Sequence, residues 1–213
     1  MQITVLCTDQ SHPVFSYLLD WRERMIELNH DVIIATDKSE LNNGDILFLV
    51  SCSQVISKAQ TSKFKAALVL HASDLPNGRG WSPHVWSILH GANEITLCLL
   101  EADNSIDTGA IWLKNRIKIE SHMLLSEINN ELFNAELLLM TQAVDNFEQM
   151  KPIPQNGVAS YWPKRSPEDS RLDPDKSISD QFDILRLADS DRHPAFIDYL
   201  GNRYLIKIEK VTD

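Results

Sequence analysis

The stretch MQITVLCTDQSHPVFSYLLDWRERMIELNHDVIIA, residues 1–35, decides the fold that this chain is expected to adopt. Its β-branched, apolar runs at residues 3–7 and 32–35 are typical of buried strands. Between them, residues 14–28 carry apolar side chains every three or four positions, which indicates an amphipathic helix. A strand, a helix and a strand in this order predict two parallel strands joined by a crossover helix.

The same alternation continues toward the middle of the chain. Near-continuous apolar runs at residues 46–50 and 67–70 predict two more strands, in a sheet that is covered on both faces. Further strands are expected at residues 94–100 and 109–119, followed by a long helix at residues 124–150. The predicted fold class is therefore α/β, with a doubly wound sheet as its core.

Composition changes after this helix and divides the chain into two parts. Residues 151–175 are rich in Pro, Ser and Asp, which favours turns and an irregular arm. We therefore expect a sheet domain at residues 1–150 and, at residues 151–213, a linker arm with a small C-terminal subdomain.

That subdomain should consist of a helix and a hairpin. Residues 177–188 have helical periodicity, and two β-type runs follow at residues 195–199 and 204–209. Gly201 and Asn202 lie between these runs, and both tolerate the positive φ that a hairpin turn requires.

Charge and motif content argue against several classes of function. The formal net charge of -10 disfavours a nucleic-acid partner, because a polyanion would be repelled. Neither GxGxxG nor GxxxxGK[ST] occurs, so dinucleotide and P-loop sites lose their main support. The three cysteines have no CxxC spacing and the histidines no HExxH pattern, so no metal site is expected.

The N-terminal residues contain no targeting pattern. They lack the basic start and the small-residue cleavage site of a signal peptide. No apolar run approaches the roughly 20 residues that a membrane span requires. We therefore expect a cytoplasmic protein without a membrane partner.

The most informative segment is LVLHASDLPNGRGWSPHVWSILHGANEITLCLLEADNSIDTGAIW, residues 68–112. It combines a histidine at the end of a buried strand, followed by SxLPxxRGxxPxxW, with IDTGAI at residues 106–111. These linked motifs resemble those of the formyltransferases that use 10-formyltetrahydrofolate as co-substrate, whose catalytic domain is a Rossmann-like sheet domain. Residues 161–189 are similar to the segment that follows this domain in methionyl-tRNA and sugar-nucleotide formyltransferases.

The motif also resembles one branch of that family. LHASDLPNGRGWSPHVW, residues 70–86, is similar to small enzymes of bacterial sugar biosynthesis. It resembles the formyltransferase of pseudaminic acid pathways, which is a sugar N-formyltransferase.

Two residues of the segment carry the expected chemistry. Formyl transfer to an amine passes through a tetrahedral carbon bearing an oxyanion, which needs a hydrogen-bond donor and a group that moves protons. His71, at a strand end where ligands bind in open α/β sheets, can supply the donor. The resemblance implies that Asp107 is the essential aspartate, which would orient the imidazole and shuttle protons through water.

One position departs from the family pattern. The family has an asparagine two residues before the histidine, where its amide holds the formyl oxygen, whereas this chain has Val69. Loss of such a donor typically lowers a rate about 10²- to 10³-fold. Ser73, Asn77 or a backbone N–H are the candidates to replace it, and the alternative is a fold kept for binding without transfer.

The resemblance also implies where the two substrates bind. In the family, the folate enters between a strand end and the loop ahead of the aspartate, which here implies binding by Ser51, Cys52, Ser53, Gln54, Val55, Ile56, Ala102 and Asp103. The alternative for Val55 and Ile56 is that they are ordinary core residues. For the acceptor, tryptophans and cations that stack on sugars or meet phosphates are the candidates, namely Arg79, Trp81 and Trp162.

We therefore predict an enzyme, an N-formyltransferase that moves the formyl group of 10-formyltetrahydrofolate to the amine of a nucleotide-linked amino sugar, in surface-glycan biosynthesis of the pseudaminic acid type. The acidic charge, the motif and the lack of the further domain of tRNA enzymes favour this acceptor over initiator tRNA. The alternatives are a non-catalytic folate or sugar-nucleotide binding protein and a formyltransferase for another amine. A homodimer is considered because dimers are common in such families.

Overall fold

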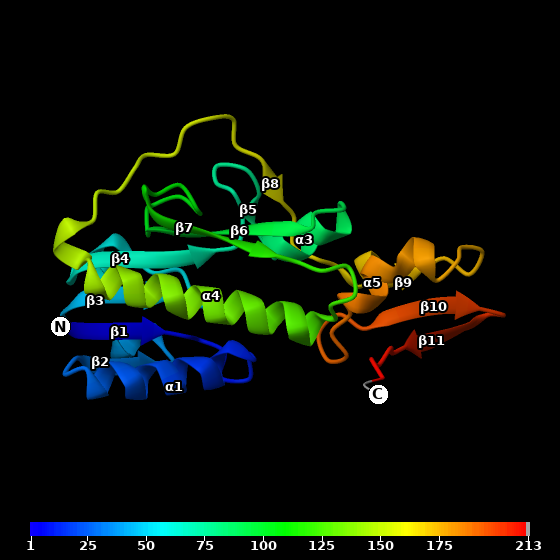
Figure 1. Ribbon diagram of the computed structural model, residues 1–213, viewed down its shortest axis with the longest axis horizontal. Helices are drawn as coiled ribbons and strands as arrows, with labels where there is room; N and C mark the ends of the chain where they lie inside the picture. Colours follow the sequence, from blue (N-terminus) through cyan, green and yellow to red (C-terminus); the bar gives the residue numbers. More distant parts are fainter. Residues whose placement is uncertain (212–213) are drawn as a thin grey trace.

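A computed structural model describes residues 1–211, and its main element is a six-stranded sheet in the order β2-β1-β3-β4-β6-β7 (Figure 1). Its strands are β1 (Gln2–Leu6), β2 (Asp31–Ala35), β3 (Gly44–Leu49), β4 (Phe64–His71), β6 (Glu94–Glu101) and β7 (Ile111–Lys118). The first four are parallel, whereas β6 runs antiparallel to β4, and β7 antiparallel to β6. The predicted α/β class is confirmed.

Two long helices cover one face of this sheet. They are α1 (Val14–Glu27) and α4 (Leu125–Asp145), and their apolar residues join alternate residues of β1 and β3 in one core. The other face is covered by loops and by short elements that include η1 (Lys38–Glu40) and α2 (Lys58–Thr61). Both faces are therefore covered, but the connections from β2 to β3 and from β3 to β4 are too short to contain a long helix.

Trp21 joins the two long helices at the centre of the core. It is fully buried in α1, and its ring meets that of Phe48 in β3 edge-on, with 5.9 Å between the centroids. Its Nε1 atom donates a hydrogen bond of 2.9 Å to the hydroxyl of Thr141 in α4. The one polar atom of this side chain is thus satisfied inside the core, as burial of an indole requires.

After α4 and η2 (Phe147–Gln149), the arm at residues 151–175 crosses back over the sheet (Figure 1). Ile153 forms an isolated antiparallel bridge with Ile111 at the start of β7. Further on, β8 (Tyr161–Trp162) pairs in parallel with β5 (Arg79–Gly80), which lies in the loop after β4. These two backbone pairings therefore hold the arm against the main domain.

The C-terminal subdomain contains the expected helix and hairpin. Its sheet has the order β11-β10-β9, and Figure 1 shows the β10–β11 hairpin projecting away from the main sheet. The remaining elements, in chain order, are α3 (Pro83–Leu89), η3 (Pro167–Ser170), β9 (Arg171–Leu172), η4 (Ser179–Gln181), α5 (Phe182–Arg186), β10 (Ala195–Tyr199) and β11 (Asn202–Ile206).

Two helices are shorter than predicted. α4 ends at Asp145 instead of continuing to residue 150, because Asn146 leaves the helical conformation at φ -111° and a 3₁₀ turn follows. The expected helix at residues 177–188 is reduced to η4 and α5. Gln181 interrupts it at φ -121°, and its side-chain amide bonds to the backbone of Asp173 instead. Within residues 1–211, no helix is both long enough and apolar enough to cross a membrane.

The hairpin turn lies one residue earlier than predicted. Tyr199 pairs with Asn202, so Leu200 and Gly201 form the two-residue turn, with φ values of 50° and 77°. This pattern is that of a hairpin turn with two positive φ values. The second strand consequently begins at residue 202 and ends at residue 206 rather than spanning 204–209.

One acidic side chain interrupts the sheet-facing side of α4. Glu136 lies one turn from Leu132 and Met140, which are buried, and it makes no hydrogen bond or ion pair with residues 1–211. Burial raises the pKa of this carboxyl from 4.5 to about 8. The folded state therefore favours the protonated form of Glu136.

We expect the stability of the protein to fall as pH rises from about 4.5 to about 8, because over this range the folded state binds a proton at Glu136 that the unfolded state has lost. Glu136→Gln should flatten this dependence and increase the free energy of unfolding at about pH 9 relative to the wild type. Urea unfolding at about pH 6 and about pH 9 measures both effects. Glu131→Gln, at an exposed position of the same helix, is the control, and equal slopes for the two variants would contradict the assignment.

Candidate active site

His71 and Asp107, the predicted catalytic pair, lie side by side. His71 is the last residue of β4 and is 7% exposed. Asp107 lies in the loop between β6 and β7, and its Oδ2 atom is 3.5 Å from the Nδ1 atom of His71. Because β6 is antiparallel, its end at Glu101 pairs with Leu68, and the loop must return along β4 to reach His71.

The imidazole of His71 is held at both edges. Its Nε2 atom donates a hydrogen bond of 2.9 Å to the carbonyl oxygen of Gly78, while Nδ1 faces the Asp107 carboxylate. The Gly78 carbonyl can only accept, so Nε2 carries the proton of this hydrogen bond. The plane of the ring is thereby fixed, with Nδ1 toward the carboxylate.

The Asp107 carboxylate is fixed in turn by the loop after β4. The backbone N–H of Gly80 donates to Oδ2 over 2.9 Å. Asp107 itself has a φ of 57°, in the left-handed region that non-glycine residues rarely occupy. The glycine of the DTG motif is required by the close approach of the backbone, because a Cβ at Gly109 would lie 1.9 Å from the carbonyl oxygen of Glu101.

Trp162 packs directly against the loop that carries Gly78 and Gly80. A Cβ at Gly78 would lie 2.7 Å from the indole Nε1 atom, and one at Gly80 would lie 2.5 Å from the carbonyl oxygen of Trp162. The indole stacks on Trp86 of α3, with centroids 5.9 Å apart and planes 15° from parallel. Trp162, proposed from the sequence as an acceptor residue, therefore has packing contacts that hold the arm against this loop.

The other acceptor candidates differ in how their polar groups are used. Arg79 donates from Nη2 to Oε1 of Gln155 over 2.6 Å and from Nη1 to the hydroxyl of Tyr161 over 3.2 Å. Trp81 is 50% exposed, and the ammonium of Lys164 lies 5.2 Å from its ring centroid. Of the three candidates, Trp81 presents the most available surface, whereas Arg79 is engaged by the arm.

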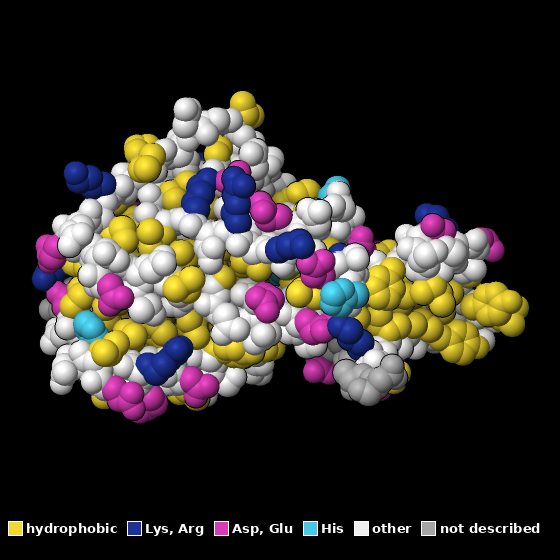
Figure 2. Space-filling view, viewed as in Figure 1, with side chains coloured by type: hydrophobic (Ala, Val, Ile, Leu, Met, Phe, Trp, Pro, Cys, Tyr) yellow, Lys and Arg dark blue, Asp and Glu magenta, His cyan; other side chains and the backbone are white. Residues whose placement is uncertain are grey.

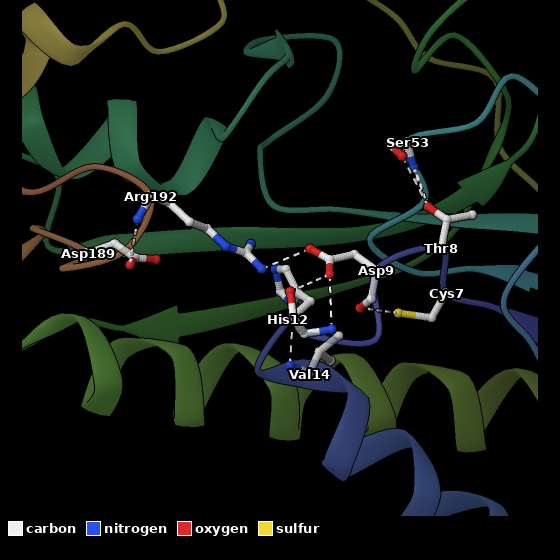
Figure 3. Close-up of polar contacts among 9 residues, drawn as sticks. Cys7, Thr8, Asp9, His12, Val14, Ser53, Asp189 and Arg192 are labelled. Atoms are coloured by element: carbon white, nitrogen blue, oxygen red, sulfur yellow. Dashed lines mark hydrogen bonds and ion pairs between the residues drawn. The ribbon is translucent and has the colours of Figure 1, made fainter.

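The loop at residues 51–56, proposed to bind folate, is anchored by polar contacts. Figure 3 shows Ser53 beside Thr8, whose hydroxyl accepts a hydrogen bond of 2.9 Å from the Ser53 N–H. Gln54 donates to the Asp37 carboxylate over 2.7 Å, and burial raises the pKa of the Cys52 thiol, which keeps it protonated. Val55 is 85% exposed, so the alternative that it is a core residue is wrong.

A cavity of about 240 Å³ joins this loop to the loop ahead of Asp107. Its lining includes Ile56, Ala102 and Asp103, together with residues from the first half of β4. The cavity therefore lies beside the start of β4, whereas His71 is at the end of this strand. Among the proposed folate residues, the structure thus brings Ile56 and the pair at 102–103 together, and a ligand that also reaches His71 must be elongated.

Val69 faces an apolar cluster rather than a polar one. It packs with buried residues that include Leu75, Cys98 and Leu100. Of the side chains considered as replacements for the family asparagine, Asn77 is exposed, whereas Ser73 is 5% exposed and its hydroxyl is buried without a hydrogen-bond partner in residues 1–211. Ser73 is therefore the better-placed free donor near Gly78.

Sequence reasoning missed a polar contact between the two parts of the chain. Figure 3 shows Arg192 of the subdomain reaching Asp9 in the loop after β1, with 2.8 Å between Nη2 and Oδ2. His12 lies in the same loop, and burial followed by the charge of Arg192 lowers its pKa. Neither residue stands in a recognisable motif, so only the folded arrangement reveals the contact.

One histidine near the pair, His84, is held neutral. Burial, and then the neighbouring His12, Arg165 and His71, lower the pKa of His84 to about 4. Arg165 is itself 8% exposed, and its Nη2 atom donates to the Ser170 hydroxyl over 3.0 Å. Near pH 7, His84 is therefore neutral and adds no positive charge beside His71.

The comparisons with known proteins agree with this geometry. The sequence pattern of the formyl transferase family matches residues 13–144, well over half of the chain, and the chain therefore belongs to this family. The methionyl-tRNA formyltransferase of Rickettsia africae is 33% identical over 135 residues, which cover 61% of this chain and 44% of that protein. The chain thus matches less than half the length of this relative.

Solved structures share the fold over nearly the whole chain. A methionyl-tRNA formyltransferase from Clostridium thermocellum has a TM-score of 0.84 at 24% identity, covering 100% of this chain and 94% of that one. HypX from Aquifex aeolicus in complex with tetrahydrofolic acid has a TM-score of 0.82 at 21% identity, covering 98% and 37%. A 4-N formyltransferase from Francisella tularensis has a TM-score of 0.75 at 17% identity, covering 99% and 98%.

The contact between the arm and Gly80 predicts that a methyl group at this position loosens the arm. Gly80→Ala should displace β8, because the new Cβ meets the Trp162 carbonyl, and limited trypsin digestion should then cut faster after Lys164. Gly91→Ala is the matched control. Gly91 also has positive φ, which costs alanine roughly 1–2 kcal/mol, but a Cβ there meets nothing within 4 Å. Equal digestion of the two variants would argue against the contact.

Proposed function

We propose that the protein transfers a formyl group from 10-formyltetrahydrofolate to the amine of a small acceptor. The observation that carries this proposal is the buried pair of His71 and Asp107 at the end of β4, within a chain of the formyl transferase family. The catalytic roles of the two residues are part of the proposal.

In the proposed reaction, the acceptor amine attacks the formyl carbon, and the carbonyl oxygen becomes an oxyanion. His71 donates a hydrogen bond to this oxyanion from Nδ1, because Nε2 is bonded to the Gly78 carbonyl, and Asp107 accepts the proton that the attacking nitrogen loses, directly or through water. Collapse of the intermediate breaks the bond to the folate nitrogen, which takes up the proton that Asp107 has accepted and leaves as tetrahydrofolate.

The folate site is proposed at the cavity between the loops at residues 51–56 and 102–106. Two exposed apolar side chains, Val55 at 85% and Ile106 at 70%, lie on these loops, and burying them against a flat ring system would be favourable. Folate is elongated, which suits a site that extends from the start of β4 to His71. The tetrahydrofolate complex of a protein with the same fold supports this choice of donor.

An amino sugar is the acceptor that we propose, linked to a nucleotide and belonging to a pathway of the pseudaminic acid type. A sugar N-formyltransferase from Shewanella sp. FDAARGOS_354, which matches over nearly all of both chains, supports a sugar. The net charge of -10 speaks against tRNA, although the methionyl-tRNA enzymes make this the second candidate. Exposed Trp81, with Lys164 beside it, offers a surface for a sugar or base and a phosphate. A cytoplasmic location follows from these substrates.

Turnover tests the function directly. We expect purified protein with 10-formyltetrahydrofolate to formylate one member of a panel of UDP-, dTDP- and CMP-linked amino sugars, detected by tetrahydrofolate release and product mass. His71→Ala and Asp107→Asn should lower kcat at least about 100-fold through loss of donor and proton acceptor. Exposed His122→Ala and Asp20→Asn are the matched controls.

Three results would change this conclusion. Formylation of initiator methionyl-tRNA alone would replace the proposed acceptor. Binding of folate without transfer to any acceptor would favour the non-catalytic alternative that Val69 suggests. Full activity of His71→Ala would remove that residue from the mechanism.

We also propose that two copies of the chain associate through the β10–β11 hairpin. Apolar side chains gather at this end of the molecule in Figure 2, and Leu200 and Leu205 are 80% and 61% exposed. β11 is an edge strand, which can pair antiparallel with its own copy. Asp198 pairs with Arg203 in the hairpin, so the hairpin carries no net charge. Two copies can therefore approach at this end, although the net charge of -10 on each chain opposes association elsewhere.

Size-exclusion chromatography with light scattering should give a dimer mass for the wild type and a monomer mass for Leu205→Glu, because a charge on the edge strand opposes burial. Leu28→Glu, at a residue that is 58% exposed at the end of α1, should remain dimeric. A monomeric wild type at all concentrations would dismiss the hairpin interface.

A further inference from the structure

We infer that Gln155 is a positioning residue that holds Asp107 in place, so that the active site is complete only when the arm is docked. This inference rests on the proposed function, in which Asp107 moves a proton, but its first test does not require turnover.

The side-chain amide of Gln155 is used completely. Its Nε2 atom donates to the carbonyl oxygens of Asp107 and Gly109, over 2.8 and 2.9 Å. Its Oε1 atom accepts from Nη2 of Arg79 over 2.6 Å. One side chain of the arm therefore contacts the backbone on both sides of Thr108 and, at the same time, the loop after β4.

Asp107 needs such an external anchor. Its left-handed backbone is unfavourable for an L residue, and such a conformation persists when its surroundings determine it. The preceding residues 103–106 are all exposed, so they provide little packing to fix the loop. The two hydrogen bonds from Gln155 act on the Asp107 and Gly109 carbonyls and thereby oppose rotation of the loop away from His71.

The arm places Gln155 by contacts that surround it in sequence. Before it, the N–H groups of Ile111 and Ile153 donate to each other's carbonyls over 2.8 and 2.9 Å. After it, the Ser160 hydroxyl accepts a hydrogen bond of 2.8 Å from the N–H of Gly78, whose own carbonyl binds His71. The arm thus contacts the Gly78 backbone, which holds His71, and the loop that carries Asp107. Gln155 makes the contact with the Asp107 loop.

Two substitutions separate positioning of Asp107 from simple anchoring of the arm. Gln155→Glu keeps an acceptor for Arg79 but has no donor for the two carbonyls, whereas Gln155→Met removes both functions. Asn156→Met is the matched control, because Asn156 is exposed and adjoins Gln155 in the arm. Thermal unfolding of all three variants establishes that they are folded.

The first measurement is hydrogen exchange of the Gly80 amide by NMR, because this N–H donates to the Asp107 carboxylate. We expect its exchange to be at least about 10-fold faster in Gln155→Glu and Gln155→Met than in Asn156→Met or the wild type. Faster exchange in Gln155→Met alone would mean that Gln155 only anchors Arg79, and it would overturn the inference. Unchanged exchange in both variants would overturn it as well.

The second measurement is of kcat and KM for formyl transfer by the Gln155 variants. Misplacement of Asp107 should lower kcat about 10- to 100-fold while changing KM for 10-formyltetrahydrofolate less than about threefold. A rise in KM with unchanged kcat would contradict positioning of the pair. If the wild type formylates no acceptor, the proposed function fails, and the exchange measurement alone decides the role of Gln155.

Discussion

The hydrogen bond from the Gly80 amide to the Asp107 carboxylate connects the two loops from which the site is built. One loop follows β4 and returns the Gly78 carbonyl to the imidazole of His71, and the other brings Asp107 back along the sheet. A carboxylate that is almost fully buried is stable only if it is bonded, and this amide and the imidazole supply its contacts. Gly80 has no side chain because the arm approaches it closely, and a Cβ there would lie 2.5 Å from the carbonyl oxygen of Trp162.

The arm extends this arrangement from two loops to three. It adds a parallel strand to β5, and Trp162 fills the space that the absent side chains of Gly78 and Gly80 leave. Because the arm follows the long helix α4, the segment that closes the site comes from the part of the chain after the sheet domain. The division into a sheet domain and an appendage therefore does not coincide with the boundaries of the site.

Much of the fold follows from local patterns in the sequence. The apolar runs and the helical periodicity of residues 1–70 determine four parallel strands and α1, because burial of these residues leaves few other arrangements. The linked motifs placed His71 and Asp107 at one site, where the structure brings them together. Boundaries set by side-chain bonds, such as the interruption of a helix at Gln181, do not appear in periodicity.

The contacts of the arm could not be predicted from local sequence patterns. Gln155 contacts a carbonyl 48 residues earlier, and nothing in a Pro-containing arm marks one glutamine as a donor to it. The sequence makes Arg79 a reasonable candidate for an anionic acceptor, because its partner, Gln155, lies 76 residues later and no local pattern reveals the pairing. Trp162 likewise looked available for a ligand, since its stacking on Trp86 depends on how the arm crosses α3.

That stack gives the protein an optical property. Two indoles with centroids 5.9 Å apart have electronically coupled transitions, and this coupling contributes to the circular dichroism of the protein. One indole belongs to α3 of the sheet domain and the other to the arm, so the coupling exists only while the two are in contact. The chain therefore carries an intrinsic chromophore pair that reports arm closure in solution without any added label.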